Sequence, residues 1–390
     1  MISFENTENA FAYKSDKDLK RAYRLFQLVG LPWLVSFGKK LTPIAFRLRL
    51  PIKGLIKATI FRQFCGGETI EDCNETIATL HKYGVGTILD YSVEGKTEDE
   101  GFEETCHEII ATIKKSANEP AIPFAVFKIT GIARFGLLEK MNDPANTLSD
   151  SEREEYQLLF QRLDKICLNA YQAQTPVFID AEESWIQDSI DRLATAMMQK
   201  YNEQTAVVFN TLQMYRHDRL EYLYQLHKKA QQIGFKVGVK LVRGAYMEKE
   251  RERALKLNYP SPIQPDKMSC DLDFNKALTY IVENISDFSL CNGTHNEESS
   301  LLLTKLIAEH NIYPKDRSIY FAQLLGMSDH ISFNLAAGGY NVAKYVPYGP
   351  VKEVMPYLLR RADENTSVAG QTGRELSLLQ KEYTRRKQNR

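Results

Sequence analysis

The sequence predicts an α/β protein built on a distorted (β/α)8 barrel of the TIM type, and two observations indicate it. Eight short, apolar, β-branched runs recur along the chain, and each is followed by polar residues and then by an amphipathic helical pattern. Near-continuous apolar runs that alternate with helices are typical of buried parallel strands. Eight such units over about 280 residues favour a closed barrel over an open sheet, which usually brings a glycine-rich first turn.

The expected strands, in chain order, are residues 86–90, 123–128, 176–180, 206–210, 237–243, 289–295, 318–323 and 341–345. Around them we expect a helical N-terminal extension over residues 1–80, the barrel itself over residues 81–370 and a charged, solvated helical tail over residues 371–390. The helix directly after the eighth strand is expected over the barrel mouth.

Two irregular stretches separate these elements. Ser151 and Glu154 have the spacing of a capping box, which predicts a helix start after the turn at residues 142–149. Residues 259–266 contain three prolines, each of which removes a donor and blocks a helix, so no regular element is expected there. Two roles stay open for this insertion: a cover over the barrel mouth, or an inert surface loop.

Composition argues against several classes of protein. The chain has 50 basic and 50 acidic residues, which does not suit a nucleic-acid binder. Its six cysteines form no Cys-x-x-Cys pair, which predicts reduced thiols, and none of its seven histidines has a zinc-type spacing, so no metal is expected. No apolar stretch approaches the roughly 20 residues of a membrane span and no signal segment is seen, so the sequence predicts a cytoplasmic protein.

Polar side chains gather at the C-terminal ends of the expected strands. In a barrel these ends open on one face, where the active sites of this fold lie. The residues are Asp90, Glu94, Lys128, Asp180, Asn210, Gln213, Arg243, His295, Gln323 and Tyr345.

A pair of arginines follows the last strand. On a helix Tyr357, Arg360, Arg361 and Glu364 fall within an arc of roughly 100°. Two guanidinium groups on one rigid element suit a planar anion such as a carboxylate or phosphate. The alternative is a solvated basic helix end, since arginine also suits the C-terminal dipole.

The residues by themselves leave the chemistry open. Lys128 at a strand end is compatible with a Schiff-base aldolase. The run from Arg243 to Tyr246 suits a phosphate-bearing planar cofactor lying against backbone, although an ordinary tight turn would also explain it. These patterns together predict a barrel enzyme that binds an anionic cofactor and a small carboxylate. A non-catalytic carboxylate- or phosphate-binding barrel remains the alternative from another class.

Five motifs, in register from about Asp90 to Ser367, resemble the proline dehydrogenase family. They lie at residues 178–183, 240–246, 293–296, 321–327 and 357–365. The resemblance implies an FAD at the C-terminal strand ends and oxidation of L-proline to Δ1-pyrroline-5-carboxylate by hydride transfer to flavin N5. It also implies a membrane quinone as electron acceptor and pyrroline-5-carboxylate dehydrogenase as the downstream partner.

The same resemblance implies roles for individual residues. The proline carboxylate would be held by Lys128, Arg360 and Arg361, and the ring would be surrounded by Leu324, Tyr345 and Tyr357. Glu94 would pair with Arg360 as a gate. Asp180 would orient its neighbours. The implied flavin contacts are Asn210 or Gln213, Lys240, Arg243, Gly244, Ala245, Tyr246, Thr294, His295, Asn296, Glu364 and Ser367. Many bacterial members carry arginine where this chain has Lys240, which we interpret as a mark of a subfamily.

Two further expectations concern specificity and location. Relatives that oxidise hydroxyproline typically carry serine at the position of Tyr345, so this chain is expected to prefer proline, with hydroxyproline dehydrogenase as the alternative. Residues 19–67 contain ten Lys or Arg and no acid, with large apolar residues between them. That pattern predicts peripheral contact with anionic lipid at the inner membrane; packing on an acidic flank of the barrel is the alternative.

Overall fold

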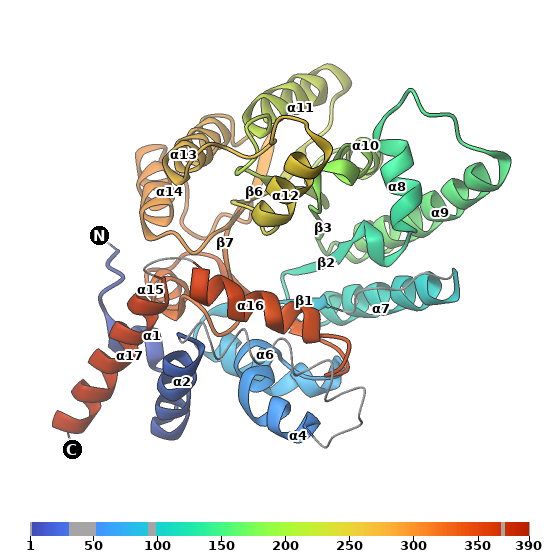
Figure 1. Ribbon diagram of the computed structural model, residues 1–390. Helices are drawn as coiled ribbons and strands as arrows, with labels where there is room; N and C mark the ends of the chain where they lie inside the picture. The colour runs from blue at the N-terminus through green and yellow to red at the C-terminus, as the bar shows by residue number, and fades with distance from the viewer. Residues whose placement is uncertain (1, 31–51, 93–98, 368–370, 390) are drawn as a thin grey trace. The chain divides into compact units, whose positions relative to one another are not determined.

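The computed structural model describes residues 2–30, 52–92, 99–367 and 371–389. Its strands form a closed parallel barrel in chain order (Figure 1). They are β1 Val85–Tyr91, β2 Phe124–Lys128, β3 Val177–Asp180, β4 Val208–Gln213, β5 Val237–Val242, β6 Phe288–Gly293, β7 Ile319–Leu324 and β8 Val342–Tyr348. Each expected strand overlaps an observed one, so the predicted fold class is confirmed.

The chain divides into two compact units. One comprises Met1–Glu94 and Gln323–Arg390, and the other comprises Gly95–Ala322. The helices of the first unit are α1 Thr7–Phe11, α2 Asp16–Val29, α4 Lys53–Ile56, the π-helical turn Lys57–Phe61, α5 Arg62–Phe64, α6 Asn74–Lys82, α15 Asp329–Ala337, α16 Met355–Ser367 and α17 Gln371–Gln388. Those of the second are α7 Asp99–Ala117, α8 Phe135–Asn142, α9 Asp150–Ala173, α10 Ser184–Tyr201, α11 Arg219–Ile233, α12 Met247–Leu257, α13 Lys267–Glu283 and α14 Glu297–Glu309.

In the first unit the two ends of the chain pack together. Figure 1 shows the blue helices α1 and α2 beside the red helix α17, and both contact it. Their shared core includes Phe11 and Leu19 from the N-terminal helices and Leu378 and Leu379 from α17. Burying these side chains together gives short N-terminal helices the stability that they would lack alone.

The prediction of a solvated tail is therefore wrong for one face of α17. Leu378, Leu379, Glu375 and Glu382 are all buried. The two carboxylates have partners, because Glu382 is bonded to Arg385 and Arg386 and Glu375 accepts a hydrogen bond from the backbone N–H of Ser328. The buried face is hard to recognise from the sequence, because its few apolar residues are interspersed among the many charged residues of this helix.

The second unit carries β2 to β6, with α7 to α14 around them (Figure 1). Aromatic rings fill the interior near the N-terminal ends of the strands. Phe124 stacks on Phe178 with ring centroids 4.4 Å apart, and Phe209 and Tyr320 meet Phe124 edge-on at 5.8 and 4.7 Å. This closes the lower part of the interior as a packed core and leaves the C-terminal strand ends for polar groups.

The start of α9 corrects the predicted capping box. Ser149, not Ser151, is the N-cap residue: its hydroxyl accepts a hydrogen bond from the Glu152 N–H, and its backbone N–H donates to the Glu152 carboxylate. Both Ser-x-x-Glu spacings fit the same motif, and the helix begins at Asp150.

Part of the basic segment at residues 19–67 lies outside the described residues, since 31–51 are not described. Four of its cations pair with acids that flank the segment: Lys53 and Lys57 with Glu68, and Arg21 and Arg62 with Asp18. Within the described part of the chain, no helix is both long and apolar enough to cross a membrane. All six cysteines are buried and free, as expected for reduced thiols.

Candidate active site

The interior face of β2 to β6 carries a layer of polar side chains at its C-terminal end. Lys128 is in register with Asp180, Thr211 with Lys240, and Lys240 with Cys291. Registered residues of parallel strands share a face. The Lys240 ammonium pairs with the Asp180 carboxylate and lies 5.4 Å from the centre of the Phe178 ring. The fold therefore brings two of the predicted site cations and the predicted orienting carboxylate into one layer.

A second acid, Glu182, lies just beyond this layer and was not singled out from the sequence. It is 4% exposed, and its carboxylate accepts hydrogen bonds from the Thr130 N–H at 3.1 Å and the Thr130 hydroxyl at 2.5 Å. Burial raises the pKa of Glu182 to about 7, against the opposing effects of Lys128 and the Thr130 hydrogen bonds. Glu182 is thus a titratable group close to a predicted substrate cation.

The backbone of Glu182 continues the network towards the predicted flavin contacts. Its carbonyl oxygen accepts a hydrogen bond from Gln213 Nε2 at 2.7 Å, and Gln213 Oε1 accepts one from the Ala245 N–H at 3.3 Å. Its own N–H donates to Gln187 Oε1 at 2.8 Å. These bonds connect the ends of β3, β4 and β5.

Arg243 is the centre of a further cluster after β5. Its guanidinium donates to Asp271 at 2.7 Å, to the Thr294 hydroxyl at 2.5 Å and to the Ser299 hydroxyl at 3.0 Å. The next residue, Gly244, has φ +138°, and a Cβ there would lie 2.5 Å from the Tyr215 ring. This position therefore requires glycine for both its backbone conformation and its packing.

Two predicted flavin contacts have structural roles. Asn210 points towards the helices, where its amide nitrogen donates to Asp191 at 2.8 Å and Tyr222 at 3.3 Å. Gln213, the alternative to Asn210, is also bonded within the chain, to Glu182 and Ala245. Asn296 is the N-cap of α14, and its side chain accepts from the Ser299 N–H at 2.8 Å.

The remaining predicted substrate residues belong to the first unit. Tyr345 on β8 is buried, and its carbonyl oxygen accepts a hydrogen bond from the Leu325 N–H, directly after Leu324. On α16 the Arg361 guanidinium lies 5.2 Å from the centre of the Tyr357 ring. Arg360, one residue earlier, is half-buried. Tyr345 and Tyr357 thus contribute buried aromatic surface to this unit.

Three predicted residues cannot be placed. Glu94 lies outside the described residues, and the side chains of Glu364 and Ser367 on α16 do so too. Tyr246 and His295, by contrast, are half-buried at the ends of the segments that follow β5 and β6.

The donor set of the second unit fits the FAD that the resemblance implies. Lys240, Arg243 and Thr294 offer cations and a hydroxyl, which suit a diphosphate and the polar edge of a flavin. In addition, the Thr211 hydroxyl is 3% exposed and its oxygen has no hydrogen-bond partner among the described residues. Buried polar groups normally have a hydrogen-bond partner, so the unpartnered Thr211 hydroxyl in the layer of Lys240 is consistent with a ligand there.

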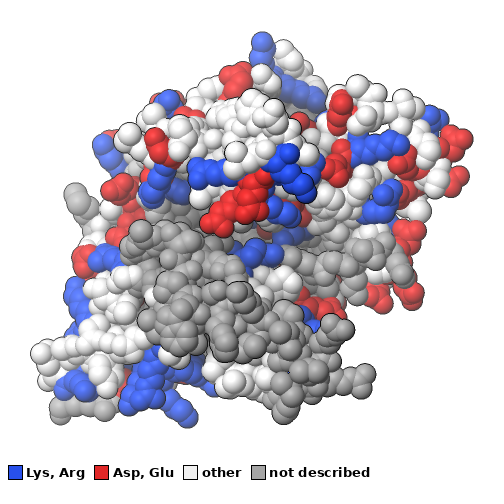
Figure 2. Space-filling view, viewed as in Figure 1, with Lys and Arg blue, Asp and Glu red and all other residues white. Residues whose placement is uncertain are grey.

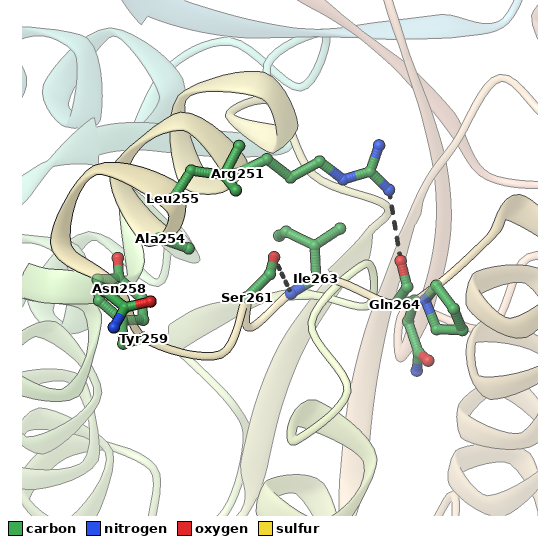
Figure 3. Close-up of a pocket in the computed structure, with 9 residues that line it drawn as sticks. Arg251, Ala254, Leu255, Asn258, Tyr259, Ser261, Ile263 and Gln264 are labelled. Carbon is green, nitrogen blue, oxygen red and sulfur yellow. Dashed lines mark hydrogen bonds between the residues drawn. The ribbon is translucent and has the colours of Figure 1, made fainter.

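The proline-containing stretch at residues 259–266 is irregular, as predicted. With α12 it encloses a surface pocket of about 490 Å3 (Figure 3), where Arg251 donates to the Gln264 carbonyl oxygen at 3.5 Å. Figure 2 shows basic and acidic side chains mixed over this helix, whose sequence is MEKERERALKL. The pocket's described lining contains no predicted site residue, so it does not decide between a cover and an inert loop.

Comparison with known proteins decides the family. The family model described as Proline dehydrogenase matches residues 73–374. The chain belongs to the proline dehydrogenase family. This proline dehydrogenase family member is accordingly an oxidoreductase, and the resemblance inferred from the motifs is confirmed.

Relatives of this family member carry several names. The mitochondrial proline dehydrogenase 1 of Dictyostelium discoideum is 33% identical, covering 98% of this chain and 74% of the relative. The hydroxyproline dehydrogenase of Xenopus laevis is 30% identical over 96% of this chain and 88% of the relative. The carbapenem antibiotics biosynthesis protein CarD of Pectobacterium carotovorum subsp. carotovorum is 32% identical over 83% of each.

Solved structures agree on the fold. Proline utilization A from Bdellovibrio bacteriovorus, inactivated by N-propargylglycine, superposes with a TM-score of 0.72 at 19% identity and covers 93% of this chain. The protein from Corynebacterium freiburgense gives 0.66 at 18% identity and covers 95%. This chain spans only 38% and 35% of those longer chains, so the likeness concerns only the part of each that matches this chain.

Proposed function

We propose that this protein oxidises L-proline to Δ1-pyrroline-5-carboxylate with a bound FAD and passes the electrons to a membrane quinone. The observation that carries the proposal is the polar layer of Lys128, Asp180 and Lys240 at the strand ends of a proline dehydrogenase family barrel. Cations at this position suit the carboxylate of an amino acid and the polar edge of a flavin.

Each group has a distinct task in this proposal. FAD, when bound, supplies the hydride acceptor. Lys128, Arg360 and Arg361 are predicted to hold the substrate carboxylate, because charge-assisted hydrogen bonds fix both position and orientation. Lys240, held by Asp180, and the Arg243 cluster are predicted to hold the cofactor.

Buried surface then defines the ring site. Tyr345 and Tyr357 are 7% and 6% exposed, and with Leu324 they are predicted to exclude water from the substrate ring. A pyrrolidine needs no activating acid once its amine is neutral, so the site requires orientation more than proton transfer.

Hydroxyproline is the second candidate substrate. It is favoured by the similarity to the Xenopus laevis hydroxyproline dehydrogenase, which nearly equals that to the Dictyostelium discoideum proline dehydrogenase. Against it stands Tyr345, whose bulk we expect to leave no room for a ring hydroxyl.

Anaerobic spectroscopy tests the proposal. The purified protein should be yellow, and L-proline should bleach the flavin absorbance, whereas trans-4-hydroxyproline should bleach it far more slowly. A colourless protein, or a yellow one that neither compound bleaches, would contradict the proposed function. Trapping of a covalent adduct by borohydride would instead support the Schiff-base alternative.

A further inference from the structure

Glu182 is a buried acid without an assigned role. It is 4% exposed, and both of its carboxylate oxygens are bonded to Thr130, two residues beyond Lys128. Through its backbone it also joins Gln213 and Gln187. These bonds hold the chain that leaves β2 against the end of β3, so Glu182 determines where the backbone next to Lys128 lies.

The charges around Glu182 come from several elements. Lys128 of β2 lies near enough to favour the ionised form, whereas the neighbouring Glu183, which pairs with Lys249 of α12, disfavours it. Gln187 of α10 and Gln213 of β4 are neutral. Beyond Gln187 lies Asp191, which is held by Arg219 at 2.7 Å.

Thr130 can keep its contact with Glu182 in both charge states. A threonine hydroxyl either donates or accepts a hydrogen bond. It donates to the ionised carboxylate at 2.5 Å, and by rotation it can accept from the protonated acid. Protonation of Glu182 therefore leaves the position of the β2 end unchanged while it alters the charge beside Lys128.

Burial brings the pKa of Glu182 to about 7, so both charge states are populated at neutral pH. A carboxylate that binds at Lys128 adds a second negative charge close by. A nearby negative charge disfavours the ionised form of a carboxyl group, so the bound anion raises the pKa of Glu182 further. Binding of the carboxylate then strengthens proton binding at Glu182, and protonation of Glu182 strengthens carboxylate binding by the same factor.

We propose that Glu182 is a positioning residue for Lys128 and takes up one proton from solvent when a carboxylate binds there. The proton goes to the Glu182 carboxylate, and no bond in the ligand changes. This inference rests on the proposed function, in which Lys128 contacts the substrate carboxylate. Its consequence is that carboxylate affinity falls as pH rises through neutrality.

The test uses the full chain with its flavin and a carboxylate that has no amine to titrate. Tetrahydrofuran-2-carboxylate meets this need because a ring oxygen replaces the proline nitrogen, which also prevents hydride loss. Calorimetric titrations at pH 7 in phosphate and in Tris, whose ionisation enthalpies differ, measure the protons taken up. At pH 7 about half of the Glu182 carboxylates are already protonated, so we expect about half a proton per ligand, with about tenfold weaker binding at pH 8.5 than at pH 6.

Substitutions assign the uptake to one group. Glu182→Gln keeps the shape and can still bond to Thr130, so it should bind the ligand with no uptake and a flat pH profile. Glu183→Gln is the matched control: it removes the adjacent buried carboxylate, which pairs with Lys249 and disfavours the ionised form of Glu182, so uptake should persist with its pH midpoint lowered.

A pair at position 130 provides a second assay. Thr130→Val removes the hydroxyl and should displace the pH midpoint of uptake, whereas Thr130→Ser should restore it. Wild-type binding without uptake, uptake that survives in Glu182→Gln, or an unchanged midpoint in Thr130→Val would overturn the inference alone. If the wild type fails to bind the carboxylate at all, the proposed function fails and the inference with it.

Discussion

Lys344 of β8 and Asp329 of α15 form an ion pair of 2.9 Å, in which the side chains are 0% and 4% exposed. The Lys344 ammonium also donates to the carbonyl oxygens of Leu324 and Met327. Asp329 in turn accepts a hydrogen bond from the Tyr13 hydroxyl at 2.7 Å. The pair therefore joins the strand of Tyr345 to the turn after β7 and to the segment after α1.

Lys344→Met should destabilise the protein strongly. It leaves the Asp329 carboxylate buried without its nearest cation, and breaking a buried pair costs about 3–5 kcal/mol. Chemical denaturation followed by circular dichroism measures the change. Lys305→Met is the control, because Lys305 and Glu309 form an exposed pair of 3.6 Å and should contribute less than about 1 kcal/mol. Equal stability of the two variants would refute the role of the buried pair.

Gly326→Ala should destabilise the turn that follows Leu324. Gly326 has φ +76°, and a Cβ there would lie 2.2 Å from the carbonyl oxygen of Gln63. The left-handed backbone alone costs an L-residue about 1–2 kcal/mol, and the clash adds to it. Gly54→Ala, in a helix with nothing within 4 Å, should be neutral or stabilising. The melting temperatures of the two variants distinguish these outcomes.

Replacing any of the cations that are predicted to bind the proline carboxylate by methionine should lower kcat/KM for proline. A hydrogen bond to a charged group contributes about 1.5–3 kcal/mol, so kcat/KM should fall roughly 10- to 150-fold in Lys128→Met, Arg360→Met and Arg361→Met. Steady-state kinetics with a quinone analogue measures it. Arg134→Met, which removes an exposed partner of Glu155, serves as the control. Wild-type kinetics in all three variants would disprove the carboxylate assignment.

Tyr345→Ser should narrow the preference for proline over trans-4-hydroxyproline. The buried phenol is predicted to clash with a ring hydroxyl, and serine makes room for it, with some loss of proline activity because packing beside the ring is removed. The ratio of kcat/KM for the two substrates is the measurement. An equal loss for both substrates would mean that the tyrosine only fills space.

Contact of residues 19–67 with a membrane should depend on charge. Each Lys or Arg near an anionic surface adds about 1 kcal/mol, so flotation with phosphatidylglycerol vesicles should recover the protein at low salt and lose it at high salt. Vesicles of phosphatidylcholine are the control. Because Lys53 and Lys57 already pair with Glu68, their substitution should matter little. The absence of salt-sensitive binding would leave packing against the protein's own acids as the explanation.

The sequence alone was sufficient for the barrel, because the signal for a buried strand is local. Apolar runs such as residues 237–243 and 318–323 coincide with β5 and β7 to within one residue at each end. The family motifs likewise indicated the cations at the strand ends, since residue type and spacing are visible in a linear chain. The structure then placed Lys128, Asp180 and Lys240 in one layer.

Other features were decided only by tertiary structure. The buried face of α17 depends on helices from the opposite end of the chain, which no local pattern of charges reveals. The same holds for Glu182, which the sequence presents as one of three acids within residues 180–183. Its pKa near 7 arises from burial beside Lys128, and its partner Thr130 lies 52 residues away. Desolvation and long-range hydrogen bonds exist only once the chain has folded. The positions of the strand ends could therefore be predicted from the sequence, but the pKa values of the groups there could not.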